Sequence, residues 1–176
     1  MRDIAAIRSH IERCRVAFLA AAGGVPADKW RQPPGGGCWS AAEVVVHVTQ
    51  VERAIVDGAR KLLAEPPRQF SLWSRVLRPP FHLAQWRGPG FMRRKSPIPL
   101  DATLVADREP MLARLAEGRA VTLALLEETK ERDLRAWRWK HPFFGPLSYY
   151  EWMRTLGYHD LRHAKQIREI VDSLQK

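Results

Sequence analysis

The stretch LSYYEWMRTLGYHDLRHAKQIREI, residues 147–170, is the part of the sequence that most clearly indicates the fold. Ser148 and Glu151 stand three residues apart, in the capping box that begins many helices. Leu147 and Trp152 flank this pair as a hydrophobic staple. From Trp152 onward, apolar residues and histidines of one helical face recur at steps of three and four residues, with one step of seven, to the end of the chain. The stretch therefore predicts a long amphipathic helix that begins at Ser148.

Two further helices are predicted upstream by similar signals. The segment WSAAEV, residues 39–44, repeats the capping box with Ser40 and Glu43, and its apolar face continues to the prolines of EPP at residues 65–67. Residues 3–22 carry a helical apolar period that ends at two consecutive glycines.

A fourth helix is expected within residues 102–131. Pro110 is compatible with it only if the helix begins near Asp107, because a proline in the first turn removes no hydrogen bond. Its core candidates are Leu112, Leu115, Leu123 and Leu126. No stretch shows a convincing strand alternation. The sequence therefore predicts the all-α class and a four-helix bundle, folded as a single domain over residues 1–176.

The connection between the second and third helices, residues 66–100, is much longer than an antiparallel helix pair needs. A link of this length can cross the bundle, which would make those two helices parallel. It is rich in proline and arginine and contains tryptophans, which are uncommon in disordered linkers. We expect it to be ordered and to pack over an end or a flank of the bundle, as a lid.

The amino-acid composition bears on which partners and which location the protein can have. Lys and Arg number 29 against 19 Asp and Glu, a formal charge of +10, and they are spread along the chain. This spread favours a solvated basic surface over a nucleic-acid site, and we expect packing of Trp137 and Trp139 at a bundle end. Cys14 and Cys38 form no CxxC motif, so a reducing cytoplasm is the expected location. No apolar run is long enough for a membrane span, and no membrane partner is expected.

Three histidines share the predicted buried faces. His159 and His163 lie one helical turn apart, and His47 lies three residues after Val44 and four before Val51. Each alone could be a core residue that is hydrogen-bonded to a neighbour. Two adjacent imidazoles inside a protein each need a partner, and a divalent metal serves both, because it binds neutral imidazole. If the three rings meet at one depth, they predict a metal site.

The same residues read as HDLRH, close to the HExxH motif of zinc proteases. Two observations argue against proteolysis. Asp160 is shorter than the glutamate base of the motif, and only thirteen residues follow His163, where a third ligand would be required.

With WSAAEVVVHV (39–48) and HPFFGPLSYYEWMRTLGYHDLRHAKQI (141–167) in view, the chain resembles the DinB superfamily of bacterial four-helix proteins. The resemblance implies an up-down-down-up bundle, in agreement with the long second connection, and a homodimer. It also implies a metal triad of one histidine on the second helix and two on the fourth, which matches His47, His159 and His163. The implied cofactor is a divalent metal, zinc or nickel first and iron or manganese as alternatives.

The resemblance further implies an enzyme. Characterised relatives transfer low-molecular-weight thiols, so we predict a metal-dependent thiol S-transferase that acts on a small molecule, with a thiol as co-substrate. The alternatives are a metal-dependent hydrolase that activates water and a non-catalytic, metal-stabilised binding or scaffold protein. Catalytic and cofactor-binding residues are not assigned. For the neighbours Tyr158, Asp160 and Arg162, solvation or helix packing is the expected role.

Overall fold

The computed structural model describes residues 3–67, 70 and 96–175, and within them the chain is mostly helical. The long helices are α1 (Ile4–Gly23), α2 (Ala41–Leu63), α4 (Arg108–Glu128) and α5 (Tyr149–Leu174). Two short 3-10 helices, η1 (Ala27–Lys29) and η4 (Ala102–Leu104), lie in the connections.

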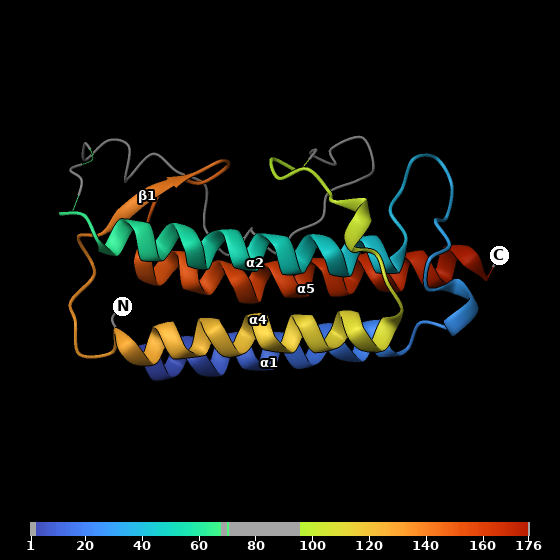
Figure 1. Cartoon of the computed structure of the whole chain (residues 1–176), viewed down its shortest axis with the longest axis horizontal. Helices are drawn as coiled ribbons and strands as arrows, with labels where there is room; N and C mark the ends of the chain where they lie inside the picture. Colours follow the sequence, from blue (N-terminus) through green and yellow to red (C-terminus); the bar gives the residue numbers. More distant parts are fainter. Residues whose placement is uncertain (1–2, 68–69, 71–95, 176) are drawn as a thin grey trace.

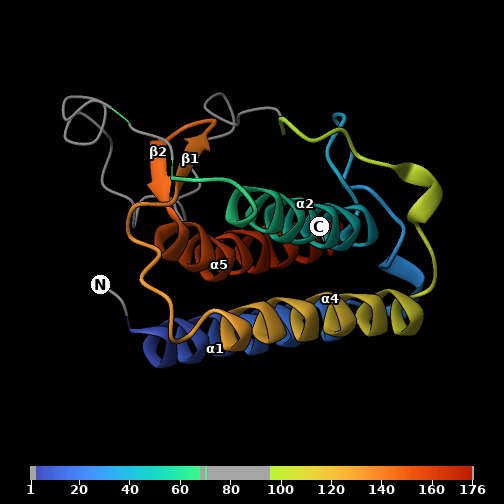
Figure 2. The same ribbon diagram turned by 60° about the vertical axis from the view of Figure 1, so that its left-hand side comes forward.

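The long helices form a bundle of two layers (Figure 1). α2 lies beside α5 in one layer, and α4 lies beside α1 in the other, with α1 packed against α5 and α2 against α4. Followed from blue to red in Figures 1 and 2, α1 and α5 run in one direction and α2 and α4 in the opposite direction. The predicted up-down-down-up four-helix bundle is therefore confirmed.

Each helix begins where local chemistry favours a start. Ser40 and Ser148 accept a hydrogen bond from the backbone N–H three residues on, and the glutamate there returns a bond to the cap, so both capping boxes are complete. Asp3 caps α1 through its side chain. Asp107 occupies the N-cap position of α4, which places Pro110 in the first turn, as predicted.

The core consists of two apolar halves along the bundle axis. The first apolar half includes Phe18, Val44, Val45, Leu115 and Ile167. The second includes Ile7, Ile11, Leu126, Tyr149 and Leu156. Between them on the four helices lie four buried charged residues, here called the four-charge layer: Arg15, Glu52, Arg119 and Asp160.

A β-hairpin precedes α5 and differs from the prediction that the chain has no strands. β1 (Arg138–His141) pairs antiparallel with β2 (Gly145–Ser148), and β2 leads directly into α5. Four-residue strands contain only two alternations, too few to separate them from a loop in the sequence. Trp139 stacks on Trp152 with ring centroids 4.8 Å apart, which joins the hairpin to α5.

Most of the long connection, and with it the expected lid, lies outside the described residues. Among the described helices, none has an apolar stretch long enough to cross a bilayer.

Candidate metal centre

The three histidines predicted as ligands come together between α2 and α5. One ring nitrogen from each of His47, His159 and His163 lies within 4.8 Å of the corresponding nitrogens of the other two. The ring centroids are 5.2 Å apart for His47 and His159, 4.9 Å for His47 and His163, and 4.4 Å for His159 and His163. The rings thus meet at one depth, the condition on which the metal prediction rests. These residues are called the histidine triad below.

Helix geometry explains the convergence. His159 and His163 are four residues apart on α5, so their rings emerge side by side. His47 lies on the buried face of α2. Because α2 packs antiparallel beside α5, the His47 ring lies opposite those of His159 and His163. Trp39, just before the α2 cap, packs against the His47 ring with centroids 4.9 Å apart.

The hydrogen bonds of His163 define which of its nitrogens can bind a metal. Its Nδ1 lies 2.8 Å from Oε1 of Gln166. A carbonyl oxygen only accepts, so Nδ1 carries the hydrogen and Nε2 is the ring nitrogen with the electron pair. That Nε2 lies 3.1 Å from Nε2 of His159, which places two potential metal-binding nitrogens together. Gln166 therefore has the role of an outer partner that orients a metal ligand.

Burial lowers the pKa of two of the triad histidines, His47 and His159. His47 and His163 are each 5% exposed, and His159 is partly exposed. Burial, with a smaller effect of Arg162, lowers the pKa of His47 to about 4. Burial, followed by the neighbouring His163 and His47, holds the pKa of His159 well below its usual range. Neutral imidazole is the form that binds metal ions, so the protonation state fits the proposed ligands.

One buried nitrogen of the triad lacks a partner. Among the residues that the structure describes, nothing hydrogen-bonds to Nδ1 of His47. Buried polar atoms are rarely left unsatisfied, and a bound cation that fixes this ring is one resolution. The donor set and this nitrogen together make the triad a suitable site for a divalent metal.

Of the two roles expected for Asp160, solvation or helix packing, the structure shows helix packing. Asp160 is 1% exposed and pairs with two arginines from other helices. Burial raises its pKa, and Arg15 and Arg119 oppose that rise. Burial acts in the same direction on Glu52, but there Arg119 and Arg15 prevail and the pKa is lowered. The sequence held a signal for this: Asp160 lies four residues after Leu156, on the buried face.

Three other residues that were candidates in the sequence have structural contacts outside the triad. Glu43 completes the α2 capping box, as predicted. His141 lies in the hairpin, where its Nδ1 accepts hydrogen bonds from the backbone N–H groups of Phe143 (3.0 Å) and Phe144 (3.3 Å). Tyr158 packs on His10 of α1, with ring centroids 4.7 Å apart.

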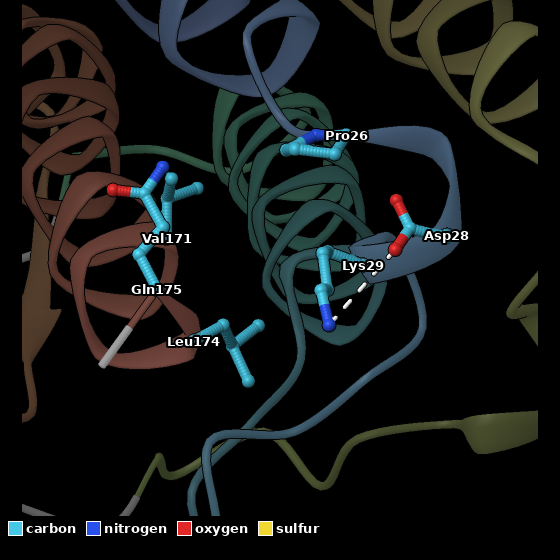
Figure 3. Close-up of a pocket in the computed structure, with 6 residues that line it drawn as sticks. All are labelled: Pro26, Asp28, Lys29, Val171, Leu174 and Gln175. Atoms are coloured by element: carbon cyan, nitrogen blue, oxygen red, sulfur yellow. Dashed lines mark ion pairs between the residues drawn. The ribbon is translucent and has the colours of Figure 1, made fainter.

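A small cleft near the C-terminal end of α5 is separate from the triad (Figure 3). It has a volume of about 160 Å³, and no triad residue lines it. Figure 3 shows Val171 and Leu174 of α5, and Gln175 just after it, facing Pro26 and the Asp28–Lys29 ion pair. Its lining offers no histidine or cysteine, so it has no soft metal donors.

The comparison with protein families shows to which family the chain belongs. The family model described as the DinB superfamily matches residues 10–167. The chain belongs to the DinB superfamily.

Two individual proteins are similar to this chain over most of its length. YuaE of Bacillus subtilis (strain 168), an uncharacterized protein, is 27% identical over 154 residues, covering 87% of this chain and 90% of YuaE. The crystal structure of TT2238, a four-helix bundle protein, superposes with a TM-score of 0.58 at 24% identity over 94% of this chain and 98% of TT2238.

A second solved structure has a similar fold. YfiT from Bacillus subtilis is described as a probable metal-dependent hydrolase with an unusual four-helix bundle topology. It superposes with a TM-score of 0.66 at 15% identity, over 98% of this chain and 87% of YfiT. At these identities the two structures support the fold of the chain.

Proposed function

We propose that this DinB-superfamily protein is a metal-dependent enzyme whose centre is the histidine triad. The observation that carries the proposal is the convergence of His47, His159 and His163, with one ring nitrogen of each within 4.8 Å of the others. Three protein ligands leave coordination positions open, the arrangement of catalytic rather than structural sites. Imidazole donors suit zinc and nickel, our first choices, and iron or manganese are alternatives.

The residues of the chain prepare the site for such an ion. Gln166 holds the hydrogen of His163 on Nδ1, and burial keeps His47 neutral, so nitrogen electron pairs are available near neutral pH. When bound, a divalent cation would supply the positive charge that lowers the pKa of a water molecule or a thiol beside it. Trp39 packs against the His47 ring and gives that side of the triad an apolar neighbour.

Thiol S-transfer to a small molecule is the first reaction that we propose. A thiolate is the form that attacks an electrophile, and a cation at the triad would favour it. The formal charge of +10 suits a co-substrate with carboxylates. We also propose a homodimer, in keeping with the family resemblance.

Hydrolysis by activated water is the second candidate. It is supported by the likeness to YfiT, which is described as a probable metal-dependent hydrolase. The same triad would serve either reaction, because both begin with deprotonation of a small nucleophile.

The decisive measurement is the metal content, by plasma mass spectrometry, of protein purified without an affinity tag. We expect about one metal per chain in the parent and none in His47→Ala or His163→Ala. His10→Ala, which removes a histidine outside the triad, is the matched control and should keep the metal. A parent without metal, even after reconstitution, would contradict the proposal and favour a non-catalytic binding or scaffold protein.

The metal-loaded protein then separates the two reactions. Incubation with a low-molecular-weight thiol and an electrophile tests S-transfer, and incubation with esters and amides in the absence of thiol tests hydrolysis. In either case, the rate should be lost in His47→Ala and retained in His10→Ala.

A further inference from the structure

The four-charge layer crosses the centre of the bundle, and each long helix contributes one member. Arg15 comes from α1, Glu52 from α2, Arg119 from α4 and Asp160 from α5. Their exposed fractions are 5%, 2%, 5% and 1%. Two guanidiniums and two carboxylates balance in charge, which is the condition for burying ions without an excess charge.

Each arginine binds both carboxylates. Arg15 donates from Nε to Oδ2 of Asp160 at 2.9 Å, from Nη2 to Oδ1 at 3.2 Å, and also from Nη2 to Glu52. Arg119 donates from Nε to Oε1 of Glu52 at 2.8 Å and from Nη2 to Oδ2 of Asp160 at 3.0 Å. The arginines therefore bridge Glu52 on α2 to Asp160 on α5.

The third nitrogen of each guanidinium also donates a hydrogen bond. Nη1 of Arg15 donates to the carbonyl oxygen of Leu115 at 3.2 Å, and Nη1 of Arg119 to that of Ile11 at 2.7 Å. The hydroxyl of Thr122 donates to Oε1 of Glu52 at 2.7 Å. Such forked, charge-assisted bonds restrict both the distance and the direction between their partners.

The bridged carboxylates lie on the two helices that carry the histidine triad. Asp160 directly follows His159 on α5, and Glu52 lies five residues after His47 on α2. A rotation of α5 or a shift of α2 that separated the triad would also break the arginine bridges. Apolar contacts impose no such direction, because burial of apolar surface depends on area alone.

We propose that Arg15, Glu52, Arg119 and Asp160 are positioning residues for the histidine triad. They set the rotation and the register of α2 against α5, so that the imidazoles of His47, His159 and His163 converge. The metal part of this inference rests on the proposed function, whereas the convergence of the rings can be measured without a metal.

The test separates positioning from stability. Combining Glu52→Leu with Arg119→Met removes one charge of each sign, leaves the Arg15–Asp160 pair intact and cuts the bridge from α2 to α5. Charge-balanced replacement of buried ions by apolar side chains is often neutral for stability. Leu125→Ala, a buried residue of the second apolar half on α4, is the control that lowers stability without touching the layer.

Two quantities are measured for each protein: zinc affinity by competition with a chromophoric chelator, and nuclear Overhauser contacts between the imidazole protons of the metal-free form. In the double variant we expect a helical protein with an unfolding midpoint near that of the parent. Its zinc affinity should be about 10- to 100-fold lower, with weakened contacts between His47 and His159. Leu125→Ala should unfold at a lower temperature with the affinity of the parent.

Parental affinity and parental ring contacts in the double variant would overturn the proposal. If the double variant does not fold, Thr122→Val decides, because it removes one bond to Glu52 and keeps all four charges. A severalfold loss of zinc affinity there supports positioning, and an unchanged affinity overturns it. If the parent binds neither zinc nor nickel, iron or manganese, the proposed function fails, and the ring contacts alone decide this inference.

Discussion

Gln166 accepts a hydrogen bond from Nδ1 of His163 at 2.8 Å, so Nε2, which faces His159, is the nitrogen that can bind a metal. Gln166→Leu keeps the approximate volume and removes the acceptor, so we expect zinc affinity to fall by about 10- to 100-fold. Gln166→Glu restores an acceptor and should bind zinc at least as tightly as the parent. Chelator competition on the three proteins measures the effect. Equal affinities in Gln166→Leu and the parent would show that Gln166 does not orient the ligand.

His141 is the residue with the clearest expected pH dependence outside the triad. Burial lowers its pKa to about 4 in the folded protein, against 6.5 ordinarily. Between these values the unfolded chain takes up a proton that the folded protein does not, so stability is present above pH 6.5 and falls as the pH falls toward 4.

His141→Asn tests this dependence, because its carbonyl oxygen can still accept from the backbone of Phe143 and Phe144 but does not titrate. From pH 7 to pH 5 we expect the variant to lose about 1 kcal/mol less stability than the parent, after allowance for partial exposure. Urea unfolding at several pH values measures the difference, to which the other histidines contribute equally in both proteins. Parallel pH profiles would contradict the assignment.

At the scale of elements, α1 and α5 approach closely where Gly157 faces His10. A Cβ on Gly157 would lie 2.4 Å from Nε2 of His10. We therefore expect Gly157→Ala to destabilise the protein by about 1–3 kcal/mol, although alanine favours a helix by about 1 kcal/mol over glycine. With His10→Ala in the background, the clash is gone and Gly157→Ala should stabilise. Chemical denaturation of this double-mutant cycle measures both signs, and equal effects in the two backgrounds would exclude the contact.

Sequence patterns predicted the helices better than the other elements, for physical reasons. The capping boxes at Ser40 and Ser148 and the constraint from Pro110 are local, so they could be recognised without the fold. The hairpin depends on the packing of Trp139 against Trp152, a tertiary contact. The metal site could be proposed from the spacing of the histidines. The four-charge layer could not be predicted, because charged residues are usually exposed and their pairing partners lie far away in the sequence.

At the scale of the whole molecule, a metal at the triad would link α2 to α5 and stabilise the folded state. Free zinc at about 100 times its dissociation constant contributes about 2.7 kcal/mol. For a chain of this size that corresponds to a rise of about 5–10 °C in the unfolding midpoint. Thermal unfolding of the metal-free and zinc-loaded protein measures the shift, which should be absent in His47→Ala. An equal shift in that variant would place the zinc elsewhere.

The four-charge layer also has a consequence for how the chain reaches this fold. A slip of α5 by one turn would move the Asp160 carboxylate by about 5.4 Å, into an apolar half of the core. Arg15 and Arg119 would then share the single carboxylate of Glu52, which leaves one buried positive charge uncompensated, a severe penalty in a dry interior. Compact states with misaligned helices are therefore less stable than the native one. The four-charge layer thus widens the energy gap between the native helix alignment and compact states with a shifted α5.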